Sequence, residues 1–123
     1  MEVKKFFSKA ACRHYALPKE AVEAFMALPP ERRVATWGYP ANTEDVEASL
    51  IGTVTSLVDL GHNVEVDVSL DMVKEGAKLV TSLLEGGKQL TCGLSGYGHV
   101  DERGAVMDSI EYVAISEPLE KRG

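Results

Sequence analysis

The sequence contains few of the residues that are typical of disulfide-bonded, metal-binding or nucleic-acid-binding domains. Only two of its 123 residues are cysteines, Cys12 and Cys92, and no CxxC spacing or Cys/His cluster accompanies them. This pattern excludes a zinc site and a disulfide framework, and small buried thiols are the simpler interpretation. Basic residues are also scarce, because 13 Lys and Arg stand against 19 Asp and Glu, a net charge of −6. Phosphate neutralisation needs clustered Lys and Arg, so no nucleic-acid partner is expected.

Long uncharged runs are missing as well. The longest, Ala48–Val58 and Gln89–Val100, fall well short of the roughly 18 residues that a membrane-spanning helix needs. Near the start, Lys9 and Arg13 interrupt the apolar core that a secretory signal requires. We therefore expect a product made in the cytoplasm with no membrane partner. No phosphate-binding loop or metal-ligand spacing occurs, so no cofactor and no metal are expected.

What remains is the composition of one folded domain. The chain is 45% hydrophobic and 26% charged, and a chain of this length commonly forms a single core. We expect one domain over residues 1–123, with a charged tail at 118–123 that is either flexible or held by contacts.

Two helices are predicted from the spacing of apolar residues. Lys19–Leu28 places Val22, Phe25 and Met26 on one face, after Pro18 and before the pair Pro29-Pro30, which cannot continue a helix. Met72–Glu85 has an apolar stripe, with Asp71 as the expected N-cap and Gly86-Gly87 as the left-handed stop.

Strands are predicted between and after these helices. Arg33–Tyr39 is a short strand that ends at Pro40, and the polar residues that follow form a loop or a brief helical turn. Ile51–Asp59 and Asn63–Leu70 form the clearest hairpin, because valines alternate strictly with polar residues in the second strand. Glu65, Asp67 and Asp59 form an acidic, solvated face of it.

The last two strands are expected at Gln89–Val100 and Ala105–Ser116, joined across a turn that ends at Gly104. The element order is strand, helix, strand, strand, strand, helix, strand, strand. Hairpin-length links indicate antiparallel pairing. We therefore predict an α+β domain: a small antiparallel sheet, or a partly closed β-barrel of five or six strands, with two helices.

The run from Thr91 to His99 is the most unusual local feature, because three glycines fall within six residues and surround Ser95. On one interpretation Ser95 is a nucleophile with glycine amides nearby, which requires a base within hydrogen-bond reach. On the other, the run is a bulged, glycine-rich strand at a barrel corner, and residue types alone favour this second interpretation. Trp37 and Tyr97 are candidates for lining a groove, although a single tryptophan is more often core filler.

From about Leu17 to Pro118 the chain resembles the prohead (capsid-maturation) proteases of tailed bacteriophages, which share a fold with the herpesvirus assembly proteases. The resemblance depends on short pieces that recur in order: Leu17-Pro18 with Ala24-Phe25, Trp37–Tyr39, Ile51-Gly52, Leu84–Gly87, Gly93–Gly98 and Glu111–Pro118. It implies a prohead-protease-like fold, with the family's catalytic serine at Ser95 and an acidic third member at Glu111.

The family's catalytic histidine falls on Tyr39. A tyrosine of pKa about 10 is a poor base near neutral pH, so the site is expected to be degenerate. Neither His14, near the amino end, nor His62, in a hairpin turn, is well placed to serve as the base. His99 shares a strand face with Ser95 but is four residues away, about 13 Å along an extended strand, a gap that only a strong bulge could shorten.

The resemblance therefore predicts a bacteriophage head protein, decoration- or cement-like, that binds the major capsid protein or other head subunits within the virion and does not cleave them. A homo-oligomer is compatible with this role. Two alternatives stay open: an active maturation serine protease that uses Ser95, and a small phage regulator that binds a host protein.

Overall fold

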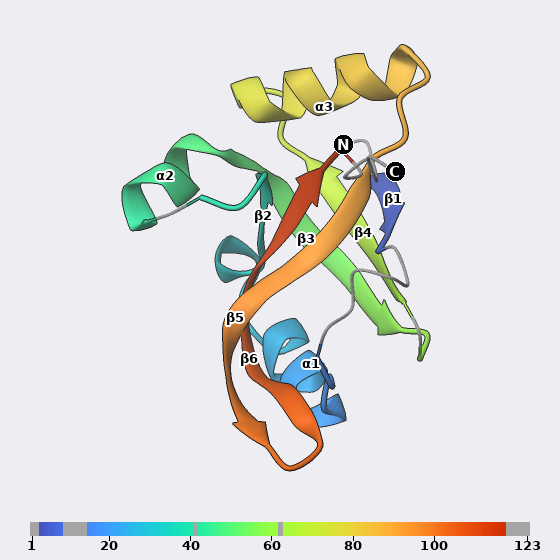
Figure 1. Cartoon of the computed structure of the whole chain (residues 1–123). Coiled ribbons are helices and arrows are strands. Elements are labelled where there is room, and N and C mark those ends of the chain that lie inside the picture. The colour runs from blue at the N-terminus through green and yellow to red at the C-terminus, as the bar shows by residue number, and fades with distance from the viewer. Residues whose placement is uncertain (1–2, 9–14, 41, 62, 118–123) are drawn as a thin grey trace.

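A computed structural model describes residues 3–8, 15–40, 42–61 and 63–117 (Figure 1). Cys12, His14, His62 and the tail at 118–123 lie outside the described residues. The elements in chain order are β1 (Val3–Phe7), α1 (Lys19–Met26), the 3₁₀ turn η2 (Pro30–Arg32), β2 (Val34–Trp37), α2 (Thr43–Ala48), β3 (Leu50–Asp59), β4 (Val64–Leu70), α3 (Glu75–Glu85), β5 (Thr91–Asp101) and β6 (Gly104–Ser116).

The strands form a closed barrel in the order β1-β4-β3-β2-β6-β5, so the chain is an α+β protein as predicted. The prediction of purely antiparallel pairing was wrong, because β2 pairs with β6 in parallel and β1 meets β5 in parallel. Short links fix the direction only of strands that follow each other directly, and these two pairs join strands far apart in the chain. Parallel contact at two seams closes the barrel.

The predicted β3–β4 hairpin is confirmed, with Val54 opposite Val68. The alternating residues of β4 are buried in the barrel: Val64, Val66, Val68 and Leu70. Its outward face is less exposed than predicted, because β1 pairs alongside and Lys5 Nζ lies 2.6 Å from Glu65 and 3.5 Å from Asp67. The acidic face is therefore partly neutralised within the chain.

Helix α1 begins and ends close to the prediction, with Ala21 and Phe25 buried. Helix α3 begins three residues later than predicted, at Glu75 with Lys74 as its N-cap and no side-chain cap. Asp71 instead accepts a hydrogen bond from the Val73 amide at 3.1 Å, which closes a turn before the helix. The helix ends as predicted, since Gly87 has a φ of 81°.

A third helix, α2, replaces the predicted loop or brief helical turn. Its N-cap is Asn42, whose side chain accepts a hydrogen bond from the Asp45 amide at 2.9 Å. Figure 1 shows α3 across one end of the barrel and α1 at the other end, beside the β5–β6 hairpin. None of the helices that the structure describes is long and apolar enough to cross a membrane.

Candidate functional site on the outward face of strand β5

Strand β5 turns alternate residues into and out of the barrel. Cys92 and Leu94 are buried in the core, which places Gly93, Ser95 and Tyr97 on the outward face. The hairpin that β5 forms with β6 is held at its far end by the chain before α1, because the Met107 amide donates to the Ala16 carbonyl at 3.0 Å. The candidate serine therefore lies on a braced strand, partly buried.

Two β-bulges interrupt the hairpin, and both fall on β6. Ser95 is opposite Tyr112 while Gly96 is opposite Ile110, which leaves Glu111 as an extra residue in β6. The second bulge leaves Asp108 extra in the same way. Both residues are exposed. The bulges therefore place two carboxylates beside the outward row of β5.

Glycines at 96 and 98 are required by this pairing. A Cβ on Gly96 would overlap the backbone carbonyl of Ser109, and one on Gly98 would overlap that of Val106. The glycine-rich run was predicted to be either a bulged strand or an open catalytic site. At these two positions the bulged-strand interpretation is confirmed, because the glycines make room for the neighbouring backbone, although the extra residues belong to β6.

Gly93 makes room for a side chain, the Tyr39 phenol. A Cβ on Gly93 would overlap the Tyr39 hydroxyl, so this phenol reaches across to the strand that carries Ser95. The Pro40 carbonyl accepts a hydrogen bond from the Tyr112 hydroxyl at 3.3 Å, which fastens the same segment to β6. The strand β2 that precedes Tyr39 is not a neighbour of β5, because β6 lies between them.

His99 is engaged away from Ser95. Its Nδ1 lies 2.5 Å from Asp108 Oδ2, and its Nε2 lies 3.9 Å from Asp101 Oδ2. The hydrogen bond with Asp108, together with that carboxylate's charge, raises the pKa of His99 above 6.5. Because the bulges are on β6, they leave the four-residue spacing between Ser95 and His99 along β5 unshortened.

Glu111, predicted to orient a catalytic base, contacts Tyr97. A hydrogen bond to Glu111, and then the charge of that carboxylate, raises the pKa of the Tyr97 hydroxyl above 10.0. The Tyr97 hydroxyl therefore stays protonated and can donate a hydrogen bond to the Glu111 carboxylate.

The Ser95 hydroxyl forms no hydrogen bond within the described part of the chain. The structure places Tyr39 and Glu111 on the same outward surface as Ser95, but it does not assemble a relay from hydroxyl to base to carboxylate among the residues it describes. A serine without a base is a weak nucleophile at neutral pH.

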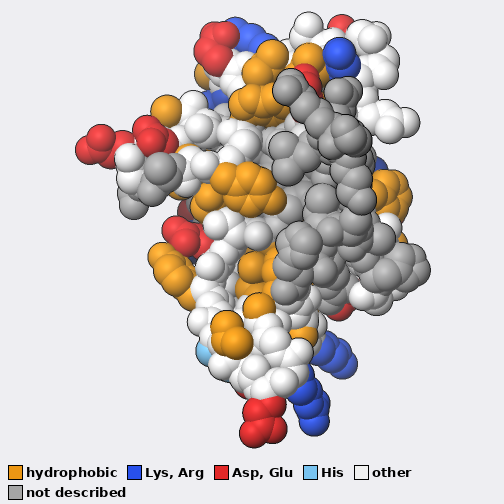
Figure 2. Space-filling view, in the orientation of Figure 1, with side chains coloured by type: hydrophobic (Ala, Val, Ile, Leu, Met, Phe, Trp, Pro, Cys, Tyr) orange, Lys and Arg blue, Asp and Glu red, His pale blue; other side chains and the backbone are white. Residues whose placement is uncertain are grey.

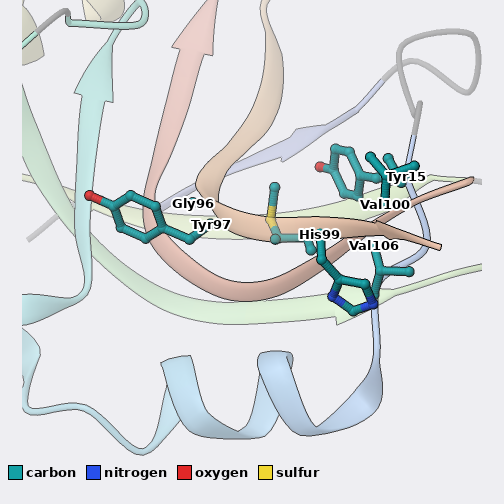
Figure 3. A pocket seen from close by; sticks show the side chains of 9 residues that line it. Tyr15, Gly96, Tyr97, His99, Val100 and Val106 are labelled. Atoms are coloured by element: carbon teal, nitrogen blue, oxygen red, sulfur yellow. The ribbon is translucent and has the colours of Figure 1, made fainter.

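Tyr97 lines two surface cavities. One, of about 270 Å³, lies along the hairpin and is lined by Tyr15, Val100 and Val106 among others (Figure 3). The other, of about 420 Å³, lies between η2, α2 and β6. The prediction that Tyr97 lines a groove is thus confirmed, whereas Trp37 packs against the core.

Neither a metal-binding cluster nor a reactive thiol is found among the residues that the structure describes. The described residues contain no group of three or more His, Cys, Asp or Glu side chains placed to hold a metal ion. Burial raises the pKa of the Cys92 thiol to about 12, so it is a core residue and not a nucleophile.

The sequence alone gave no signal for the His99–Asp108 contact or for the cavity beside α2. Both depend on the bulges and on a helix that the sequence pattern does not indicate. Comparisons of this chain with protein-family models, with curated proteins and with solved structures find no match.

Proposed function

We propose that this protein binds another protein and does not cleave it, acting as a decoration- or cement-like head protein of a tailed bacteriophage on a degenerate prohead-protease-like fold. The partner on this proposal is the major capsid protein or another head subunit, and the site of action is the virion. The observation that supports the binding role is the setting of Ser95: the Tyr39 phenol lies beside Gly93, two residues earlier on β5, while His99 is held by Asp108.

The chemistry argues against hydrolysis at this site. A serine nucleophile needs an acceptor that titrates near neutral pH, and a phenol does not. Removing the base of a triad lowers turnover by about a millionfold in a dissected serine protease. Tyr39 cannot act as the base, and the His99 imidazole is bound to Asp108. Ser95 is therefore left without a group that activates it.

The hairpin that carries Ser95 is suited to binding. Tyr97 is 68% exposed and Val100 is 79% exposed, and both lie on a hairpin braced at its tip. Exposed aromatic residues beside cavities are typical anchors of protein interfaces.

A serine-directed fluorophosphonate probe tests the loss of catalysis. We expect no labelling of the wild-type chain and no difference from Ser95→Ala, measured by intact-mass spectrometry. Labelling that disappears in Ser95→Ala would show an activated serine and would support the maturation-protease alternative.

Quantitative mass spectrometry of purified phage heads tests the binding role. In particles of the tailed phage that encodes this chain, we expect it in a fixed ratio to the major capsid protein. Heads that assemble and expand normally but lack the protein would contradict a decoration role and favour a regulator.

A further inference from the structure

The larger cavity, here called the Tyr97 groove, has an apolar floor and a polar edge. Its apolar lining comes from four separate parts of the chain: Leu28 between α1 and η2, Val34 of β2, Val46 of α2 and Ile110 of β6. Ser109, Tyr112 and Tyr97 complete one side. A volume of about 420 Å³ falls within the range of roughly 300–1,000 Å³ that is typical of binding pockets.

Tyr97 also lines the smaller cavity along the hairpin. Figure 3 shows Tyr97 at one end of that cavity and Tyr15 with Val100 at the other. The two cavities therefore share one exposed aromatic residue. Side chains two residues apart on an extended peptide are separated by about 6.6 Å, which would let one strand-like segment place a side chain in each cavity.

The charge around the Tyr97 groove is strongly negative. Besides Asp108, which contacts His99, the three elements that border it carry five exposed carboxylates, those of Glu31, Glu44, Asp45, Glu47 and Glu111. None of the five forms an ion pair with a cation of the described chain. Figure 2 shows acidic side chains gathered over α2.

One cation, Arg32, also lines the groove, and it forms no ion pair with another residue that the structure describes. Its neighbour Arg33 is used internally, because Nε donates to the Val54 carbonyl at 3.0 Å and Nη1 to the Leu28 carbonyl at 2.5 Å. Arg33 thus fixes the turn between α1 and η2, and it keeps its positive charge but does not line the groove. A ligand that complements this rim carries positive charge.

We infer that the Tyr97 groove binds an extended segment of a partner protein that carries two apolar side chains flanked by lysine or arginine. One apolar side chain enters the groove among Leu28, Val46 and Ile110, and the other lies beyond Tyr97 against Val100. The basic residues face the carboxylates of α2. This inference rests on the proposed binding function and specifies the chemistry of the partner segment.

A random twelve-residue peptide library displayed on yeast, selected with the purified full chain, tests the chemistry directly. We expect enriched peptides to share apolar residues at even spacing and at least one lysine or arginine beside them. A consensus without basic residues, an acidic consensus, or no enrichment would overturn the inference.

Variants of the chain then locate the binding site on the most enriched peptide, with fluorescence anisotropy as the measurement. Tyr97→Ala should weaken binding by about tenfold, as expected for an aromatic anchor. Glu47→Gln should weaken it about two- to fivefold, with a shallower salt dependence. The matched control is Glu85→Gln, because both carboxylates lie near the end of a helix and only Glu47 is on α2. Equal effects of the two glutamine variants would overturn the assignment.

Sedimentation velocity separates a partner from a second copy of this chain. We expect a monomer whose sedimentation is unchanged by Tyr97→Ala. A dimer that Tyr97→Ala dissociates would show that the groove is covered by another copy, which would overturn the inference.

Binding of the wild-type chain and Tyr97→Ala to purified heads distinguishes the two proposals. If both bind equally, the groove inference fails and the head-protein proposal stands. If the selected peptide binds at Tyr97 but heads do not bind, the head-protein proposal fails and the groove inference stands.

Discussion

The glycines of β5 make room for different neighbouring groups, although they belong to one sequence motif. Gly96 faces the backbone of β6, whereas Gly93 faces the hydroxyl end of a tyrosine that is 59% exposed. A backbone carbonyl in a sheet cannot move without parting the strands, while an exposed side chain can rotate away.

We therefore expect Gly96→Ala to destabilise the protein by about 1–3 kcal/mol, the usual cost of overpacking. Gly93→Ala should change stability by less than about 0.5 kcal/mol, because only Tyr39 must move. Urea unfolding followed by circular dichroism measures both. Equal losses for the two variants would contradict the distinction between backbone and side-chain neighbours.

The contact between His99 and Asp108 predicts a pH dependence. Because the folded protein raises the pKa of His99 above 6.5, the contact contributes its full stability below that value and loses it as the pH rises through the folded pKa. Asp108→Asn should therefore be more destabilising at about pH 5.5 than at about pH 9.

Proton NMR titration of the His99 ring provides the direct measurement. Its pKa should fall in Asp108→Asn and fall less in Asp101→Asn, because Asp101 lies farther from the imidazole. An unchanged titration in Asp108→Asn would show that the carboxylate does not hold the imidazole in solution.

At the scale of elements, apolar periodicity located the segments well but not every boundary. The β3–β4 hairpin followed from strict alternation, and α1 from its proline-bounded apolar face. The start of α3 was misplaced because Asp71 resembles an N-cap, yet its carboxylate closes the turn three residues earlier. Val73, which falls within the predicted helix Met72–Glu85, precedes α3 and is 83% exposed.

The actual N-cap of α3, Lys74, gives a test of this boundary. Lys74 has an extended backbone, and its side chain makes no cap hydrogen bond. Lys74→Ser should stabilise the protein by about 0.5–1 kcal/mol, because a serine hydroxyl there can accept from the amides of the first helical turn. Urea midpoints measure the gain. If Asp71 were the cap, Lys74→Ser would not raise the stability of the protein.

At the scale of the whole molecule, the barrel closes through contacts that local patterns do not encode. The strands from β2 to β6 could be located from the sequence, whereas no residues were predicted for β1. Alternation along a strand also fixes that Ser95 and Tyr97 share a face. The parallel pairing of β2 with β6 could not, since no link joins them directly. The partnership of His99 with Asp108 depends on a bulge, and a bulge leaves no periodic signal in the sequence.

Cys92 reports on the integrity of the closed barrel. Its side chain lies in the core, with Sγ 3.8 Å from the Val64 carbonyl oxygen of β4, and burial raises the pKa of the thiol from 9.0 to about 12. At pH 8 this shift makes the thiolate fraction about a thousandfold smaller than that of an ordinary thiol. In a Cys12→Ser background, iodoacetamide should therefore modify Cys92 only through opening of the barrel.

The labelling rate should rise with urea in parallel with global unfolding, because Cys92 is inside the hydrophobic core. A control reaction in full denaturant gives the rate of the unprotected thiol. Rapid labelling in native buffer, insensitive to urea, would mean that β5 separates from the barrel on its own. The candidate site and the Tyr97 groove would then lie on a mobile hairpin and not on a rigid scaffold.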